Sequence, residues 1–439
     1  ISSSDWSSDV CSSDLMEDNM EKIIVKGGRE LHGEVDISIA KNSVLPIIVA
    51  TILNPTEITL NKVPVLEDVI VLINLLRELQ CEVDFSPITG ELRINTSNLK
   101  ELDPNSELIR KMRASFLIMG PMLARFGRCK ISMPGGCNIG SRPIDLHLKG
   151  FKNLGIESEI GYGYVEAKTE RIVGNRIYLD FPSVGATENI MMAAVLADGD
   201  TIIENAAEEP EIWDLARFLN SMGAKIEGAG YGKITIHGVN ELKRPKPFTP
   251  IFDRIEAGTF MVAAAITNSK ITINGVNEEH LMPTLEKLKE IGVQCTITGE
   301  KMFVDGTLRK NSVDIKTMPY PGFPTDMQPQ IMALLSLTKG VSVITETVFE
   351  NRFMHVGELG RLGANIKIDG RVAIVDGVSN LTGCEVKATD LRAGAAMILA
   401  GLAANGQTEI GDIYHIDRGY TNIEEKFRNL GADIYRVHR

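Results

Sequence analysis

Residues 422–435 read Asn-Ile-Glu-Glu-Lys-Phe-Arg-Asn-Leu-Gly-Ala-Asp-Ile-Tyr, and this short stretch contains the pattern that decides the fold. The spacing of its apolar residues predicts an amphipathic helix over Asn422–Asn429 and a strand over Ala432–Tyr435. Gly431 separates the two and is expected to end the helix, because glycine readily takes the left-handed conformation of a helix C-cap.

The same ending, Leu-Gly-Ala or a variant of it, recurs along the chain at spacings of 68 to 75 residues. The six copies are Leu79–Cys81, Leu154–Ile156, Met222–Ala224, Ile291–Val293, Leu362–Ala364 and Leu430–Ala432. A fixed period of this kind is the signature of a repeat architecture. We therefore predict an α/β fold built from six repeats of about 70 residues.

Each repeat contains two kinds of helix. The first is rich in alanine and almost fully apolar, as in Ala393–Ala404, so it is expected to be buried on every side. The second is amphipathic, as in Leu281–Glu290, and is expected to cover the sheet from outside. Six such units predict two lobes of three repeats, with helices buried inside and sheets outside.

Two segments are expected to connect the lobes. Residues Arg244–Pro250 hold three prolines, which favour a stiff extended connector, and a second crossing is expected near Ile37–Lys41. One predicted lobe therefore comprises residues 20–40 plus 251–439, and the other residues 41–250. Residues 1–19, where Ser-Ser-Asp recurs three times, are interpreted as a non-native or disordered leader.

Composition narrows the class of protein. The chain has 439 residues, of which 44% are hydrophobic and 24% charged, as in ordinary globular proteins of two or three domains. The net charge of −12 argues against a general nucleic-acid surface, and no apolar run reaches the length of a membrane span. Six cysteines without a CxxC pair argue against a zinc ribbon or a disulfide framework and favour the reducing cytoplasm.

The loop Pro134–His147 carries the strongest chemical signal. It places Cys137 among glycines, with Arg142 five residues later. A nearby arginine favours the thiolate and also offers a fork of donors to a carboxylate or phosphate. The loop by itself fits a reactive cysteine beside an anionic substrate and an ordinary surface thiol about equally well.

Charged and polar residues recur where the predicted helices begin. They include Lys41-Asn42, Arg113, the turn Ser183–Thr187, Asp326, Arg392 and Arg418, with Arg352 on another turn. Each one alone is explained as well or better by helix capping or a solvated side chain. Their recurrence at helix starts, rather than along helix faces, predicts that these starts converge on one anion-binding cleft.

With these motifs together, the chain resembles the UDP-N-acetylglucosamine 1-carboxyvinyltransferases, a family of enolpyruvyl transferases. The resemblance runs from about Met20 to the end, through Ala40–Asn42, Met112–Ser115, Pro134–His147, Ser183–Thr187, Glu204–Ala207, Asp253–Glu256, Phe323–Gln328, Glu350–His355, Ala388–Arg392 and Tyr414–Tyr420. It implies a two-lobed inside-out α/β prism. It also implies that phosphoenolpyruvate gives its enolpyruvyl group to the 3-hydroxyl of UDP-N-acetylglucosamine, the first committed step of peptidoglycan synthesis, with no metal or organic cofactor.

The resemblance also implies residue roles. Phosphoenolpyruvate would be bound by Lys41, Arg142, Arg418, Arg352 and Arg392. The sugar nucleotide would be held by Asn42, Arg113, Ser183, Val184, Gly185 and Val348. Asp326 would take the proton from the sugar hydroxyl or orient that hydroxyl. Cys137 would act as general acid on a closing lid and be alkylated by an epoxide such as fosfomycin.

One position departs from the pattern, and two other functions stay open. Phe181 stands where some members carry a lysine that faces the nucleotide, which puts one nucleotide contact in doubt. The runner-up function is the shikimate-pathway enolpyruvyl transferase, which shares the fold and the donor but not the acceptor. A sugar-nucleotide-binding regulator is a weaker alternative, because it would not need Asp326, Cys137 and the arginines together. The oligomeric state is left open.

Overall fold

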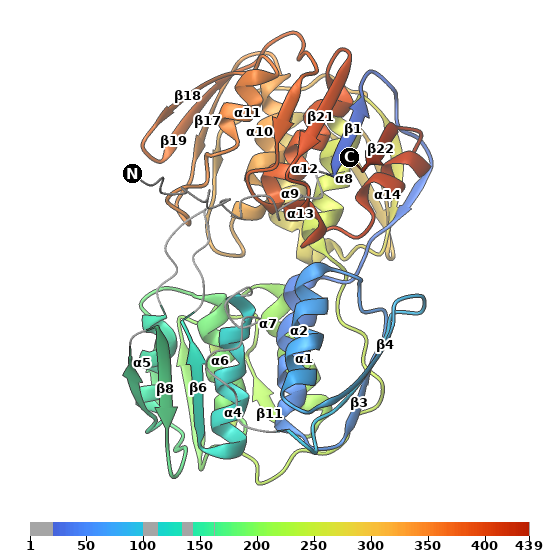
Figure 1. Cartoon of the computed structure of the whole chain (residues 1–439). Coiled ribbons are helices and arrows are strands. Elements are labelled where there is room, and N and C mark those ends of the chain that lie inside the picture. The colour runs from blue at the N-terminus through green and yellow to red at the C-terminus, as the bar shows by residue number, and fades with distance from the viewer. Residues whose placement is uncertain (1–20, 100–112, 134–143, 162, 439) are drawn as a thin grey trace, which may run out of the picture.

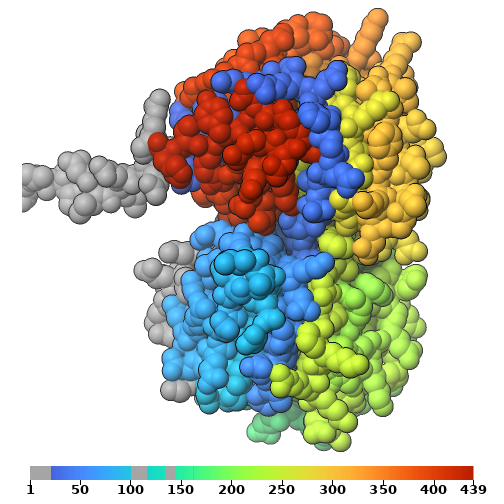
Figure 2. Space-filling model, turned by 90° about the vertical axis from the view of Figure 1, so that its right-hand side faces the viewer, coloured from blue at the N-terminus to red at the C-terminus, as the bar shows by residue number. Residues whose placement is uncertain are grey.

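The computed structural model describes residues 21–99, 113–133, 144–161 and 163–438. They form two lobes, one above the other in Figure 1. Residues between 39 and 248 build one buried apolar core, and residues 23–37 together with 255–434 build the other. We call these the N-terminal lobe and the C-terminal lobe. Seen from the side, segments from both ends of the sequence lie next to each other in the C-terminal lobe (Figure 2).

Each lobe carries three small sheets in the part of the chain that the structure describes. The sheets of the C-terminal lobe are, in strand order, β20 (Glu385–Lys387), β21 (Gln407–Gly411), β1 (Lys22–Lys26) and β22 (Asp433–Val437); β14 (Gln294–Thr298), β15 (Lys301–Asp305), β13 (Lys270–Asn274) and β2 (Glu34–Asp36); and β16 (Ile315–Lys316), β17 (Val341–Thr345), β19 (Val372–Asp376) and β18 (Asn365–Asp369). Strand β1 lies between β21 and β22, with Val25 opposite both Thr408 and Ile434. The first strand therefore completes the last repeat.

The sheets of the N-terminal lobe are β11 (Lys225–Glu227), β12 (Lys233–His237), β10 (Asp200–Glu204) and β9 (Arg176–Tyr178); β3 (Glu57–Leu60), β5 (Glu91–Asn95) and β4 (Glu82–Ser86); and β6 (Arg128–Ser132), β8 (Tyr164–Lys168) and β7 (Glu157–Ile160). Each four-stranded sheet of the molecule joins one parallel pair to antiparallel neighbours. The six sheets of the described residues match the six predicted repeats, so the predicted fold is confirmed.

The apolar helices fill the two lobes. They are α1 (Lys41–Ala50), α4 (Met119–Phe126) and α6 (Val184–Ala194) in the N-terminal lobe, and α8 (Arg254–Ile266), α10 (Gln328–Ser336) and α12 (Leu391–Ala403) in the C-terminal lobe. Their small residues permit close approach: a Cβ at Gly120 of α4 would lie 2.4 Å from the Asn189 carbonyl oxygen of α6. This explains the alanines and glycines of α6, α8 and α12, since larger side chains at these close contacts would push the helices apart.

The amphipathic helices are α2 (Glu67–Glu78), α5 (Asp145–Asn153), α7 (Pro210–Ser221), α9 (Glu278–Ile291), α11 (Val356–Arg361) and α14 (Ile423–Asn429). The expectation that they cover the sheets from outside is wrong. Helix α7 packs against α1 and α6, and the outer sheet faces stay bare, with Phe303 of β15 45% exposed and Val341 of β17 56% exposed. An amphipathic pattern shows that one helix face is buried but not which element buries it.

The predicted helix endings are confirmed. Gly431 follows α14 with a φ of +95°, in the left-handed region. Gln80, which stands in the glycine position of the first copy, follows α2 with a φ of +66°. The backbone of the repeat ending is therefore kept where the glycine itself is not.

Two antiparallel segments cross between the lobes. The Ala40 amide donates to the Ile251 carbonyl and the Asp253 amide to the Ser38 carbonyl, each at 2.8 Å. Asp214, buried in α7, accepts from the Ile251 amide at 2.9 Å and from the Ser43 hydroxyl at the start of α1. The crossing is thus tied to the N-terminal lobe at both of its segments.

Among the described residues, no helix is both long and apolar enough to cross a membrane.

Candidate active site between the lobes

The first polar group between the lobes is centred on Asp68, in the first turn of α2. Its two carboxylate oxygens accept from the Lys41 ammonium at 3.0 Å and from the Arg418 Nε at 3.0 Å. Lys41 begins α1 in the same lobe, whereas Arg418 follows the short helix α13 (Tyr414–Asp417) of the other lobe. We call Asp68, Lys41 and Arg418 the inter-lobe set, because its carboxylate joins cations from both lobes.

The second group is centred on Asp326, in the 3-10 helix η3 (Thr325–Met327) that precedes α10. One carboxylate oxygen lies 3.1 Å from the Arg352 Nη2, and the other lies 3.0 Å from the Arg392 Nη2 and 3.2 Å from its Nε. Both guanidinium groups are buried, and Arg392 also lies over the Tyr420 ring. We call Asp326, Arg352 and Arg392 the within-lobe set, since all three belong to the C-terminal lobe.

Electrostatics show that the two sets are neighbours. Burial lowers the pKa of Lys41, Asp68 opposes this, and the positive charges of Arg392 and Arg418 lower the pKa further. Burial would raise the pKa of Asp68, but Lys41 and Arg418 outweigh it and hold the carboxyl below its ordinary value. Burial would lower the pKa of Arg392, yet Asp326 and Tyr420 raise it. The pKa of Lys41 therefore lies below its ordinary value although Asp68 opposes the shift, because burial and two neighbouring guanidinium groups disfavour the charged amine.

A buried glutamate positions the loop next to Asp326. Glu346 accepts from the Val348 amide at 2.8 Å and the Phe349 amide at 3.1 Å, and its other oxygen accepts from the Thr325 hydroxyl at 3.0 Å. Val348, predicted from the sequence, is thereby fixed beside the residue that precedes Asp326. Glu346 itself was not predicted.

A further ion pair crosses the lobes at the start of α8. Arg254 binds Glu211 of α7 through two contacts of 3.1 and 3.3 Å. Burial, followed by the negative charges of Glu211 and Glu209, raises the pKa of Glu188 well above its ordinary value. Arg254 of α8 therefore adds a cation at a helix start to Lys41 of α1 and Arg392 of α12.

Apart from Val348, the residues predicted to hold the nucleotide lie on the N-terminal lobe. Ser183 caps α6 by accepting from the Ala186 amide at 3.4 Å, and Val184 and Gly185 form the first helical residues. The His147 ring faces Gly185 and contacts Asn189 of α6 at 3.1 Å. Asn42 is exposed at the start of α1, and Phe181 is 45% exposed just before the Ser183 turn.

For three predicted residues the structure describes the backbone alone or nothing. Cys137 and Arg142 lie outside the described residues. Arg113 is the first residue of the 3-10 helix η2 (Arg113–Ile118), but its side chain also lies outside what the structure describes.

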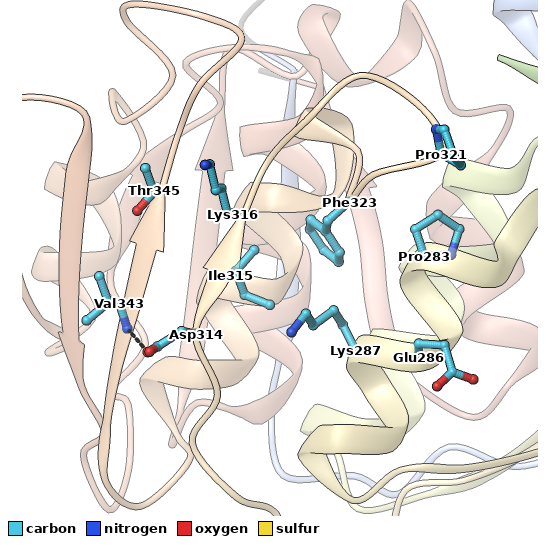
Figure 3. Close-up of a pocket in the computed structure, with 10 residues that line it drawn as sticks. All are labelled: Pro283, Glu286, Lys287, Asp314, Ile315, Lys316, Pro321, Phe323, Val343 and Thr345. Carbon is cyan, nitrogen blue, oxygen red and sulfur yellow. Dashed lines mark hydrogen bonds between the residues drawn. The ribbon is translucent and has the colours of Figure 1, made fainter. Parts of the chain in front are cut away.

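Two surface hollows lie apart from both charged sets. One of about 470 Å³ lies between α9, β16 and β17 and is lined by Lys287, Lys316 and Phe323 among others (Figure 3). The other, of about 530 Å³, lies beside the crossing segments at Ser38 and Phe252. Neither is lined by a predicted site residue.

Comparison with known proteins agrees with this geometry. Residues 25–427 match the family model described as EPSP synthase (3-phosphoshikimate 1-carboxyvinyltransferase). A protein of Clostridium tetani named UDP-N-acetylglucosamine 1-carboxyvinyltransferase 2 is 63% identical over 95% of this chain and all of its own length. One of Clostridium acetobutylicum, UDP-N-acetylglucosamine 1-carboxyvinyltransferase 1, is 63% identical over the same shares.

The chain belongs to the UDP-N-acetylglucosamine 1-carboxyvinyltransferase family.

Solved structures support the family assignment at the level of the fold. The enolpyruvyl transferase NikO from Streptomyces tendae superposes with a TM-score of 0.86 at 25% identity, covering 96% of this chain and 100% of that chain. EPSP synthase from Acinetobacter baumannii has a TM-score of 0.72 at 18% identity, over 95% of this chain and 100% of its own. The inside-out, two-lobed prism is the fold of this family.

Sequence reasoning missed Asp68, Glu346 and Glu211 in this family member. Each reads in the sequence as an acid near the start of a helix or the end of a strand, which has an ordinary structural explanation. All three are buried, Asp68 and Glu211 beside cations and Glu346 beside two backbone amides, and these contacts are visible only in three dimensions. Arg254 lies within the matched segment Asp253–Glu256, so the resemblance had marked it without assigning it a role.

Proposed function

We propose that this chain transfers the enolpyruvyl group of phosphoenolpyruvate to the 3-hydroxyl of UDP-N-acetylglucosamine and releases phosphate. The reaction passes through a tetrahedral addition intermediate and serves the first committed step of peptidoglycan synthesis in the cytoplasm. It needs no metal or organic cofactor. The observation that carries the proposal is the gathering of Lys41, Arg392 and Arg418, with Asp326 bound to Arg392, together with relatives 63% identical over their full length.

The cations suit the donor substrate. Phosphoenolpyruvate carries a carboxylate and a phosphate, and their negative charges require several dispersed cations. Lys41, Arg418 and Arg142 bind them, and Arg352 and Arg392 complete the set near the reacting carbon. Fixed cations of this kind stabilise charge that develops as phosphate leaves, and they do so more strongly once water is excluded.

Asp326 suits the acceptor side. In the addition step the sugar 3-hydroxyl bonds to C2 of phosphoenolpyruvate and a proton adds to C3. In the elimination step C3 loses a proton and the C2–phosphate oxygen bond breaks. Asp326 accepts the hydroxyl proton or orients the hydroxyl, and two arginines fix its carboxylate at about 3 Å.

The nucleotide is held by the other lobe. Asn42, Arg113 and the turn Ser183–Gly185 line the starts of helices in the N-terminal lobe, where backbone amides favour phosphate. Val348 contacts the sugar nucleotide from the C-terminal lobe. The lobes divide at residues 40/41 and 250/251, so the two substrates meet where the chain crosses.

Cys137 is the general acid and the target of epoxides. The reactive form of cysteine is the thiolate, and burial raises the pKa of Cys81, Cys129 and Cys295 to about 12. Fosfomycin is therefore expected to modify Cys137 and leave these three thiols unmodified in the native protein, as peptide mass spectrometry would show.

The test is phosphate release from phosphoenolpyruvate with UDP-N-acetylglucosamine, with shikimate 3-phosphate, or with no acceptor. Release only with the sugar nucleotide is expected, and release with shikimate 3-phosphate would establish the runner-up function instead. Cys137→Ser is expected to abolish most of the activity, whereas the matched variant Cys384→Ser, in the other lobe, is expected to keep it. Equal activity of both variants would remove Cys137 from the mechanism.

A further inference from the structure

Asp68 is an acid for which neither the sequence motifs nor the proposed roles account. It is buried, and each of its carboxylate oxygens faces a different cation, Lys41 on one side and Arg418 on the other. Both cations are assigned above to the anionic substrate. In this structure the Asp68 carboxylate lies between these two cations.

We propose that Asp68 is a positioning residue that keeps the Lys41 ammonium charged and aligned with Arg418 across the two lobes for the binding of phosphoenolpyruvate. This inference rests on the proposed function. In this proposal the Asp68 carboxylate holds the two cations that bind the substrate, and it takes no part in the chemical steps.

The surroundings of Lys41 explain why it needs this support. Its side chain is almost fully buried, and the charged groups that face it are Asp68 of α2, Arg418 after α13 and Arg392 of α12. Two of the three are positive. Burial and both arginines disfavour the ammonium form, and Asp68 is the acid among these neighbours that favours it.

The ordinary explanation for Asp68 is a helix-start acid that stabilises α2. The chain offers a matched control for this explanation, because Glu67 lies in the same first turn but is exposed. An amide at either position removes one negative charge from the same helix end. Only Asp68→Asn removes a charge that contacts Lys41.

The kinetic test measures kcat/KM for phosphoenolpyruvate from pH 6 to pH 10, at saturating UDP-N-acetylglucosamine, in Asp68→Asn, Asp68→Glu and Glu67→Gln. We expect the basic limb of the Asp68→Asn profile to move to lower pH by a unit or more, which is about a tenfold loss on that limb. The loss should appear in KM more than in kcat. Glu67→Gln should match wild type, and Asp68→Glu should restore the basic limb. An Asp68→Asn profile lowered equally at every pH would overturn the proposal.

A second measurement does not depend on turnover. Acetic anhydride acylates only unprotonated amines, so the pH dependence of Lys41 acylation, read by peptide mass spectrometry, reports its protonation directly. Lys41 should become reactive at lower pH in Asp68→Asn than in wild type or Glu67→Gln. If wild type releases no phosphate, the proposed function fails while this measurement still decides the role of Asp68. An identical pH dependence of Lys41 acylation in all three proteins would contradict the inference.

Discussion

The two charged sets between the lobes share one design and differ in one respect. In each, a carboxylate lies about 3 Å from two cations. Asp326, Arg352 and Arg392 come from one lobe, whereas Asp68 and Lys41 come from one lobe and Arg418 from the other. The within-lobe set is complete once the C-terminal lobe has folded, but the inter-lobe set exists only while the lobes lie against each other.

This difference separates two tasks. A group that acts on the reacting hydroxyl must keep its geometry through the reaction, and a single packed lobe supplies that rigidity. A group that receives an anion from solvent must open and close, and a contact between two lobes can do so around the crossing segments. We therefore expect changes in the within-lobe set to affect kcat and changes in the inter-lobe set to affect KM and the lobe arrangement.

The largest expected effect comes from Asp326→Asn. The amide cannot accept the hydroxyl proton, so kcat for phosphate release should fall by about 10²–10⁴-fold. Affinity for phosphoenolpyruvate should be kept or increased, because Arg352 and Arg392 lose their anionic partner. Steady-state kinetics and equilibrium binding of phosphoenolpyruvate would separate the two effects.

The control for this variant is Asp390→Asn, also an acid-to-amide change. Asp390 caps α12 through the Arg392 and Ala393 amides, and asparagine caps a helix equally well. The Asp390→Asn variant should therefore retain the kcat of wild type. A similar fall in both variants would mean that the effect comes from a general loss of charge near Arg392.

The next effect concerns the histidine beneath the within-lobe set. His355 is fully buried with its Nδ1 3.1 Å from the Arg352 carbonyl oxygen, and burial lowers its pKa to about 4. The unfolded chain takes up this proton below its ordinary pKa of about 6.5, whereas the folded chain does so only near 4. Stability is therefore lost as pH falls through this window, by an amount on the order of 3 kcal/mol.

Replacing His355 by glutamine should remove that part of the acid sensitivity. Melting temperatures of wild type and His355→Gln from pH 7 to pH 4 should converge as the pH falls. His237, whose side chain is 40% exposed beside Asp200, supplies the control, and His237→Gln should change the slope of wild type only slightly because a partly exposed ion pair contributes little. Parallel curves for wild type and His355→Gln would show that His355 does not carry the acid sensitivity.

The fold was predictable because it rests on local signals repeated six times. Glycine after five of the six amphipathic helices, apolar helices and short strands each follow from the conformational preferences of single residues. The packing partner of the amphipathic helices was not predictable, because helix α7 carries the same apolar face whether it lies on a sheet or beside α1 and α6. The spacing of apolar residues shows which face of a helix is buried, but it does not identify the element that packs against that face.

The site was predictable in part for a related reason. Lys41, Asp326 and Arg392 stand at helix starts, and the resemblance to a family connected them. Asp68 also stands at a helix start, but no motif of the resemblance includes it, and its partner Arg418 lies 350 residues away in the sequence. Long-range pairing of this kind depends on how the lobes meet, which no local pattern encodes.

The smallest expected effect comes from Arg418→Gln, which tests directly whether the inter-lobe set holds the lobes together. The Arg418 side chain is 37% exposed, so its ion pair with Asp68 contributes no more than about 1 kcal/mol. Loss of this pair should therefore raise the population of molecules whose lobes have moved apart by about fivefold at most. Small-angle X-ray scattering of Arg418→Gln should therefore give a slightly larger radius of gyration than wild type, and salt should reduce the difference between them. Arg352→Gln, which breaks an ion pair inside one lobe, should lower the melting temperature and leave the radius of gyration unchanged. Expansion in Arg352→Gln but not in Arg418→Gln would show that the inter-lobe set does not hold the lobes together.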